Sequence, residues 1–248
     1  MKNRNFKMVL QYEGTRYQGW QKQESTDNTI QGKIEKLLSK MCGETVEIQG
    51  SGRTDAGVHA LGQVMNAHLN TDLSAEEIME YMNRYLPEDI GVVEICEVSD
   101  RFHSRLNAKG KTYRYQVINS RIPHVFERRY AYVFPEKLDV EKMRKAAEIL
   151  CGTHDFAAFT SAKKSKKSTV RTIESIIIEK SGDMITFTFT GDGFLFHMVR
   201  ILMGTLLLVG TCATIPEDVE KILSSKNRSE AGPLVPAHGL TLVEVRYS

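Results

Sequence analysis

Cysteine is scarce in this sequence. Only Cys42, Cys96, Cys151 and Cys212 occur in 248 residues, and no Cys-x-x-Cys pair is present. Zinc sites typically use closely spaced Cys or His ligands, and disulfide-stabilised miniproteins are rich in cysteine. Four widely spaced cysteines therefore favour neither class. The seven histidines show no His-x-His or His-Glu-x-x-His pattern, and we therefore expect no metal. Isolated thiols are typical of a reducing compartment, where we expect them to be buried.

Long apolar runs are also absent. The most apolar stretch, 195–210, contains His197, Arg200 and Gly204 and falls short of the ~20 apolar residues that span a bilayer. The first residues, MKNRNFKMVLQYEG, lack the apolar segment of a signal peptide. We therefore expect a core helix over 195–210 and a cytoplasmic protein with no membrane partner.

The net charge is only +2, but the charges are segregated. Residues 72–100 hold nine acids and one arginine, whereas 101–126 hold six Lys/Arg and no acid. A second acid-free stretch, 156–173, holds four lysines and one arginine. Basic runs with interleaved aromatic rings fit a phosphate-rich polymer. For Lys163, Lys164, Lys166 and Lys167 the alternative is a solvated loop.

Hydrophobic periodicity divides the chain into two similar halves. The first half is predicted to run strand, helix, strand, strand, helix, strand, over 6–12, 29–43, 46–49, 63–69, 74–85 and 92–98. The second half begins with a strand at 111–118 and a helix at 140–150. A hairpin over 172–191, helices over 196–209 and 216–223 and a strand over 240–247 follow.

This pattern predicts an α+β fold of two tandem split β-α-β halves, ferredoxin- or RRM-like, with a pseudo-duplicated order. We expect the two antiparallel sheets to join into one extended sheet with a concave face for an elongated ligand. The predicted domains are 1–105, which carries a glycine-rich turn with an aspartate, and 106–248, which completes the cleft.

The turn GSGRTDAGVH at 50–59 is the strongest candidate for chemistry. Its glycines permit a tight backbone around Arg53 and Asp55, and it has neither the Walker nor the dinucleotide-binding spacing. Asp55 has two interpretations: it stabilises its own turn, or it is a functional carboxylate that the nearby arginine keeps ionised. We expect Trp20 and Tyr17 to pack under this turn.

Arg200 lies among apolar residues of the predicted helix at 196–209, where an unpaired cation is costly. We therefore expect an acidic partner. Asp55 and Asp192 are candidates, and a purely structural ion pair is the alternative. His197 is interpreted as an ordinary capping residue at the start of the helix.

Together, five segments resemble the tRNA pseudouridine synthases of the TruA type. They are YEGTRYQGWQ near the start, GRTDAGVHALGQV at 52–64, FHSRLNAKGKTYRY at 102–115, GFLFHMVRILMGTL at 193–206 and PAHGLTLVEV at 236–245. GRTDAGVHA followed downstream by HMVR is highly specific, and the resemblance covers nearly the whole chain. Glu13 stands where many relatives carry aspartate.

The resemblance implies an isomerase that converts uridine to pseudouridine at positions 38, 39 and 40 of the tRNA anticodon stem-loop. It implies a homodimer without cofactor or metal. Asp55 would be the essential catalytic residue, Tyr113 would lie against the target base and accept or relay the C5 proton, and Arg200 would pair with Asp55. Arg53 would occupy the space of the flipped nucleotide, and Leu242 would form the apolar wall.

The residues alone do not distinguish between two chemical routes or among three classes of function. Asp55 either removes a proton from the sugar to give a glycal or attacks carbon as a nucleophile. The alternatives to an isomerase are a non-catalytic RNA-binding module and a glycosidase, which needs a second carboxylate about 5 to 10 Å from the first. The run Lys163, Lys164, Lys166 and Lys167 is expected to contact tRNA phosphates from a mobile loop.

Overall fold

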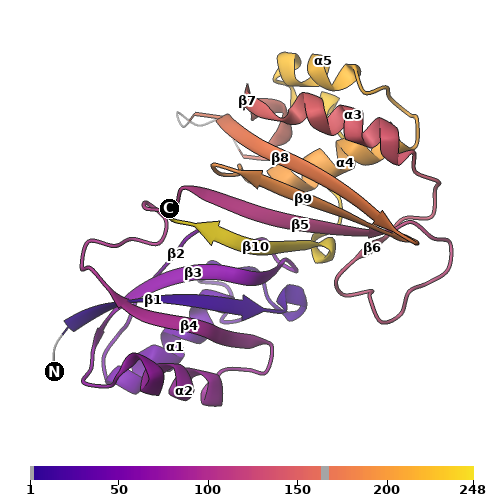
Figure 1. Cartoon of the computed structure of the whole chain (residues 1–248). Coiled ribbons are helices and arrows are strands. Elements are labelled where there is room, and N and C mark those ends of the chain that lie inside the picture. The colour runs from indigo at the N-terminus through magenta and orange to yellow at the C-terminus, as the bar shows by residue number, and fades with distance from the viewer. Residues whose placement is uncertain (1–2, 163–167) are drawn as a thin grey trace. The chain divides into compact units, whose positions relative to one another are not determined.

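The structure is a computed structural model that describes residues 3–162 and 168–248 (Figure 1). The chain divides into two units, and each has its own strands and helices. Unit 1 comprises Met1–Lys109 and Leu242–Ser248, and unit 2 comprises Gly110–Thr241. The α+β class predicted from the sequence is confirmed.

Unit 1 follows the predicted order of strand, helix, strand, strand, helix, strand. Its sheet has the order β4-β1-β3-β10, with the short β2 on β3. Strand β1 is antiparallel to both neighbours, and Met8 lies opposite Met65 on β3 and Ile95 on β4. The elements are β1 (Asn3–Tyr12), the 3-10 turn η1 (Gly14–Arg16), α1 (Ile30–Cys42), β2 (Ile48–Gly50), β3 (His59–Asn70), α2 (Ala75–Tyr85), β4 (Ile90–Val98) and β10 (Leu240–Arg246).

The two helices of unit 1 begin and end where the sequence predicts. Thr29 caps α1 by accepting a hydrogen bond from the Gly32 amide at 3.1 Å, and Gly43 ends the helix with φ of 73°. Helix α2 begins with a capping box, because Ser74 and Glu77 each accept a hydrogen bond from the other's backbone amide. The backbone amide and the hydroxyl of Ser74 both donate to the Glu77 carboxylate, and these two hydrogen bonds lower its pKa.

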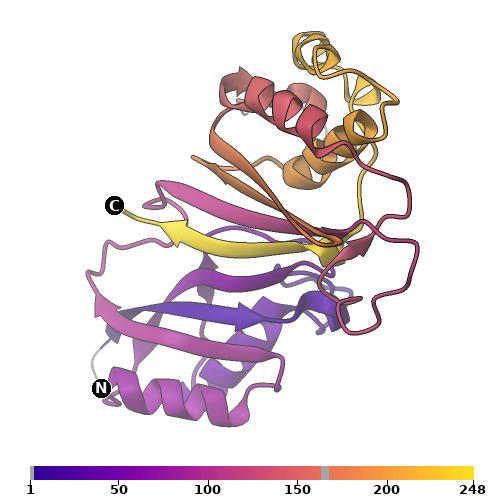
Figure 2. The ribbon, with the colours of Figure 1, turned by 45° about the vertical axis from the view of Figure 1, so that its right-hand side comes forward.

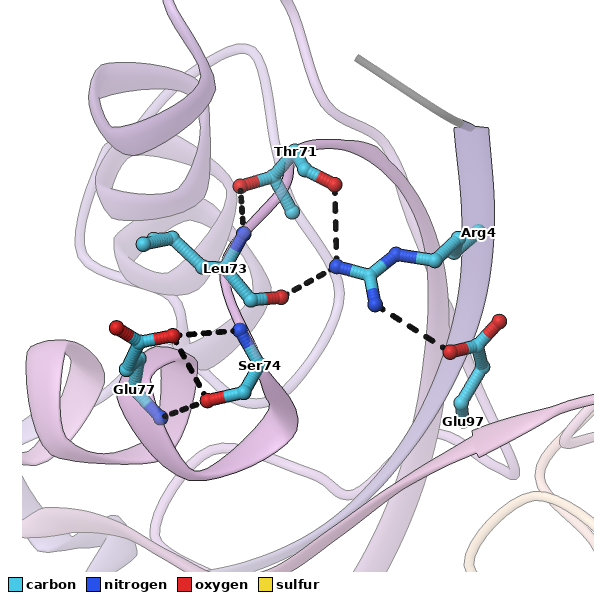
Figure 3. A network of polar contacts seen from close by, with 6 residues as sticks. All are labelled: Arg4, Thr71, Leu73, Ser74, Glu77 and Glu97. Atoms are coloured by element: carbon cyan, nitrogen blue, oxygen red, sulfur yellow. Dashed lines mark hydrogen bonds and ion pairs between the residues drawn. The ribbon is translucent and has the colours of Figure 1, made fainter.

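Arg4 ties the loop before α2 to the sheet (Figure 3). Its guanidinium donates to the carbonyls of Thr71 and Leu73 and forms an ion pair with Glu97 at 3.4 Å. Strand β1 thereby fixes the loop that carries the Ser74 cap.

Unit 2 has the sheet order β5-β9-β8-β7, and β6 pairs in parallel with β5. Helix α3 packs on α4, α5 and β8, and Figure 2 shows these helices together on one side of the strands. Phe187, Phe189 and Tyr115 have no exposed surface and form the centre of the core. The elements are β5 (Gly110–Ile118), β6 (Tyr132–Val133), α3 (Val140–Leu150), β7 (Gly152–Asp155), η2 (Phe156–Phe159), β8 (Val170–Ser181), β9 (Met184–Gly191), α4 (Met198–Gly210), α5 (Asp218–Ser225), η3 (Arg228–Glu230) and η4 (Ala237–Gly239).

Three local predictions in unit 2 have different outcomes. The hairpin at 172–191 is confirmed, and Gly182 turns the chain with φ of 59°. The helix expected from 196 begins instead at Met198, because His197 adopts a left-handed conformation with φ of 65°. The helix expected from Pro216 begins at Asp218.

The expectation of buried cysteines is wrong. Cys42, Cys96 and Cys151 are half-buried, and Cys212 is exposed. The lysine Nζ of Lys142 lies 3.1 Å from the Cys212 sulfur. Burial raises the pKa of the Cys42 and Cys151 thiols, which keeps them protonated at neutral pH.

Candidate functional site

Asp55 lies on the connection between β2 and β3, residues 51–58, which we call the Asp55 turn. The Ser51 amide donates to the Val64 carbonyl at 2.7 Å and closes the base of the turn. At its tip, the Val58 amide donates to the Asp55 carbonyl at 3.2 Å, and Gly57 adopts φ of 81°. Asp55 itself is half-buried. The turn therefore presents its carboxylate from a defined backbone.

The segment 14–20 packs against the Asp55 turn. The Trp20 amide donates to the Thr54 carbonyl at 3.0 Å, and a side chain on Gly19 would place its Cβ 2.8 Å from that same oxygen. The Trp20 ring lies against Gly50, as predicted. Tyr17 is buried as well, and its hydroxyl donates to Asp89 at 2.5 Å.

A cluster of buried polar side chains supports the Asp55 turn. The hydroxyls of Tyr12 and Thr54 are hydrogen-bonded at 2.8 Å. Gln63 is fully buried; it donates to the Gly52 carbonyl at 3.0 Å and accepts from the Ser51 hydroxyl at 2.6 Å. Burial raises the pKa of Tyr12 to about 12, against the effect of its hydrogen bonds. The turn is thus held by side chains as well as by backbone.

Sequence reasoning missed Tyr12 and Gln63. The available signal was a polar glutamine inside the predicted apolar strand at 63–69, since a buried amide needs hydrogen-bond partners.

Arg53 and Leu242 occupy contrasting environments in unit 1. Arg53 is exposed, and its Nε donates to the amide oxygen of Gln21 at 2.9 Å. Leu242 is fully buried on β10.

Tyr113 and Arg200 belong to unit 2. Tyr113 lies on β5 opposite Phe189, is 8% exposed, and meets the Phe194 ring edge-on with the centroids 5.2 Å apart. Arg200 lies on the first turn of α4, and its Nε donates to the Val235 carbonyl at 2.8 Å. Asp192, one predicted partner of Arg200, accepts from the Thr172 amide at 3.0 Å.

Near Arg200, the backbone of α4 closely approaches the backbone of the segment around Pro233. A Cβ on Gly204 would lie 1.9 Å from the Pro233 carbonyl oxygen, so α4 is in direct contact with the segment that precedes η4. Tyr115 closes this region by donating its hydroxyl to the Pro236 carbonyl at 2.8 Å. Burial raises the pKa of Tyr115, and Arg200 opposes that shift.

Other predicted residues have mixed outcomes. His197 is the N-cap residue of α4 without a side-chain cap hydrogen bond, and its ring stacks on Phe196 with the centroids 3.7 Å apart. Lys163, Lys164, Lys166 and Lys167 lie outside the described residues. Over 3–162 and 168–248, no cluster of three or more His, Cys, Asp or Glu is placed to bind a metal ion. Within the same ranges, no helix has the length and apolar character to cross a membrane.

Comparison with known proteins decides the family. A family model described as tRNA pseudouridine synthase matches residues 8–107 and 146–248. The chain belongs to the tRNA pseudouridine synthase family. The matched ranges include Arg53, Asp55, Arg200 and Leu242, whereas Tyr113 lies between them.

Relatives of known name match over almost their full length. The tRNA pseudouridine synthase A of Bacillus sp. (strain KSM-64) is 50% identical over 243 residues, which cover 98% of this chain and 99% of the relative. The tRNA pseudouridine synthase A 1 of Clostridium tetani is 48% identical over 244 residues, covering 98% and 100%. The tRNA pseudouridine synthase A of Acetivibrio thermocellus is 44% identical over 244 residues, with the same coverage.

Proposed function

We propose that this chain converts uridine to pseudouridine at positions 38, 39 and 40 of the tRNA anticodon stem-loop, as a cytoplasmic homodimer without cofactor or metal. The observation that carries the proposal is family membership, together with an aspartate presented from a turn fixed by backbone and side-chain hydrogen bonds. The reaction breaks the N1–C1′ bond, forms a C5–C1′ bond, releases the proton from C5 and adds a proton to N1, so that substrate and product are isomers. It needs neither an electron acceptor nor a second substrate.

In this proposal Asp55 carries the chemistry and acts either as a base on the sugar or as a nucleophile. A tRNA with deuterium at C2′ of the target uridines separates the routes. A primary isotope effect in single turnover indicates proton removal and a glycal, whereas a rate close to that of the protiated tRNA indicates direct attack.

The remaining site residues act on Asp55 or on the base. Arg200 pairs with the Asp55 carboxylate. Tyr113 lies against the base and relays the C5 proton, and Leu242 contributes to the apolar wall. Arg53 fills the space of the flipped nucleotide, whose extrusion costs a few kcal/mol of stacking.

The basic stretches are proposed to bind tRNA phosphates. Each cation that neutralises a phosphate steepens the salt dependence of binding. Replacing Lys163, Lys164, Lys166 and Lys167 together by glutamine should make that dependence shallower. An unchanged slope would show that the run is solvated.

Support for a homodimer comes from the loop between β5 and β6. Ile122, Val125 and Tyr130 are 71%, 58% and 45% exposed, and Phe126 is 91% exposed. The cations of this loop are all arginine (Arg121, Arg128 and Arg129). Exposed apolar and aromatic side chains with arginine and without lysine are typical of protein interfaces.

Light scattering tests this contribution. Phe126→Ser should lower the fraction of dimer, whereas Ile177→Ser, at a site 53% exposed on β8, should not. A Phe126→Ser protein that stays fully dimeric would show that this loop is not part of the dimer interface.

The function itself is tested with unmodified tRNA transcripts that carry a single uridine at position 38, 39 or 40. Carbodiimide treatment and primer extension should map pseudouridine at each position. Tight binding without modification of these transcripts or of a wider RNA pool would favour the RNA-binding module instead.

A further inference from the structure

A line of side-chain hydrogen bonds connects helix α1 to Arg53. Glu35, 5% exposed on α1, accepts from the Gln31 amide at 2.8 Å, and Gln31 accepts from the Gln21 amide at 2.7 Å. Gln21 in turn accepts from the Arg53 Nε at 2.9 Å. We call Gln21, Gln31 and Glu35 the amide relay.

Donor and acceptor chemistry fixes the orientation of the relay from both ends. Glu35 is an acceptor: it also receives the Lys22 ammonium at 3.2 Å and the Ile48 amide at 3.2 Å. Gln31 must therefore turn its NH₂ towards Glu35.

The oxygen of Gln31 then faces Gln21 and also accepts from the Lys22 backbone amide at 3.0 Å. Gln21 consequently turns its own oxygen outward. Because a guanidinium only donates, that oxygen matches Arg53.

Arg53 is held differently from other fixed arginines of unit 1. Arg16 donates its Nε and Nη2 to the Asp89 carboxylate at 3.0 and 2.7 Å, and Arg4 pairs with Glu97. A carboxylate partner cancels most of the charge that an arginine presents to a ligand. Among the residues that the structure describes, Arg53 has no ion pair, and its partner is the neutral amide of Gln21. It is thus oriented while it keeps its full charge.

We propose that Gln21, oriented by Gln31 and Glu35, is a positioning residue that directs Arg53 towards the RNA substrate without neutralising it. The inference rests on the proposed function, in which Arg53 fills the space of the flipped nucleotide, and it adds that the guanidinium neutralises one RNA phosphate there. It assigns a role to a residue that itself touches no reacting atom.

Two substitutions of Gln21 separate orientation from charge. Gln21→Glu keeps the length and the acceptor but forms an ion pair with Arg53. It should make the slope of log Kobs against log salt for tRNA shallower by about 0.7 to 0.9, the value for one phosphate contact. Gln21→Met removes the acceptor and leaves the charge, so the slope should stay and kcat/KM should fall about tenfold, the cost of losing a charge-assisted hydrogen bond.

Gln23→Glu and Gln23→Met are the matched controls. Gln23 is the same residue type on the same loop, and its amide donates to the Gln18 carbonyl at 2.8 Å, outside the relay. Both controls should retain the parent's slope and kcat/KM. A shallower slope in Gln23→Glu equal to that in Gln21→Glu would mean that any added negative charge suffices, and would overturn the proposal.

The decisive readout is a double-mutant cycle with Arg53→Ala. If Gln21 acts through Arg53, neither Gln21 substitution changes tRNA binding or turnover further in the Arg53→Ala background. Effects that persist there in full contradict the positioning role. An Arg53→Ala protein with parental binding and turnover would overturn both the relay and the role of Arg53, whereas a parent that binds tRNA but forms no pseudouridine would overturn the function alone.

Discussion

Asp55 in unit 1 and Tyr113 in unit 2 are carried by differently built scaffolds. The Asp55 turn rests on polar groups: Gln63 bonds its backbone, and Tyr12 bonds the Thr54 hydroxyl. Tyr113 rests on an apolar strand face, opposite Phe189 and beside Phe194. In the proposed mechanism the Asp55 carboxylate acts on the sugar, where polar neighbours can hold it in place, and Tyr113 lies against the base, where an apolar face excludes water.

The largest effects should come from the two side chains themselves, and they should be unequal. Asp55→Asn removes the only group proposed to attack or deprotonate the sugar and should slow turnover by more than about a thousandfold. Tyr113→Phe removes a proton relay and should cost about a hundredfold. Single-turnover assays at tRNA concentrations that saturate each variant measure both effects. Equal losses would contradict the different roles proposed for Asp55 and Tyr113.

Glycine substitutions should disturb close backbone contacts in both units. A Cβ on Gly14 would lie 2.0 Å from the Val58 carbonyl oxygen, beside the Asp55 turn, and one on Gly204 would lie 1.9 Å from that of Pro233. Gly14→Ala and Gly204→Ala should each lower the free energy of unfolding by about 1 to 3 kcal/mol and also reduce turnover.

Gly91 is the control, because the nearest atom to its Cβ would be the Asn83 side-chain oxygen at 3.9 Å. Urea unfolding of Gly91→Ala should match the parent. If Gly14→Ala were equally neutral, the close packing of segment 14–20 on the turn would be incorrect.

A matched pair of Tyr→Phe variants sharpens the comparison. Tyr12 bonds Thr54 in unit 1, and Tyr115 bonds the Pro236 carbonyl in unit 2. Each loss should reduce the free energy of unfolding by about 1 kcal/mol. Only Tyr12→Phe loosens the Asp55 turn, so its turnover should fall further than that of Tyr115→Phe.

The pH dependence of Tyr12→Phe has a definite sign. Burial raises the folded pKa of Tyr12 from 10.0 to about 12. The stabilisation from keeping this phenol neutral is therefore complete below pH 10 and is lost as the pH rises towards 12. The free energy of unfolding of Tyr12→Phe should fall less steeply than that of the parent over this interval; parallel curves would contradict the burial of the hydroxyl.

The smallest effects should come from helix caps remote from the site. Ser74 caps α2 in unit 1, and Asp139 caps α3 in unit 2. Ser74→Ala and Asp139→Ala should each lower the free energy of unfolding by about 1 kcal/mol and leave turnover unchanged. A loss of turnover greater than the loss of folded protein would link these helices to the site.

Local chemistry explains which parts of the fold were predictable. The predicted bounds of the helix at 29–43 and of the hairpin at 172–191 are confirmed, because Thr29, Gly43 and Gly182 are single residues with strong preferences for cap or turn backbone. The start of α4 was misjudged because His197 adopts a left-handed conformation that its residue type does not indicate.

The candidate site was predictable in its motif and not in its supports. Arg53 and Asp55 are separated by one residue in a glycine-rich turn, so the local sequence alone marks them. Gln63 and Gln21 support that turn from other segments of the chain. Such pairings depend on tertiary contacts that residue periodicity does not encode.

Release of tritium from tRNA labelled at C5 of uridine tests the central claim most directly, because forming the C5–C1′ bond expels the hydrogen at C5. The account predicts release with the parent, in step with pseudouridine formation, and none above background with Asp55→Asn although that protein still binds tRNA. Equal release by both proteins would contradict a catalytic role for Asp55.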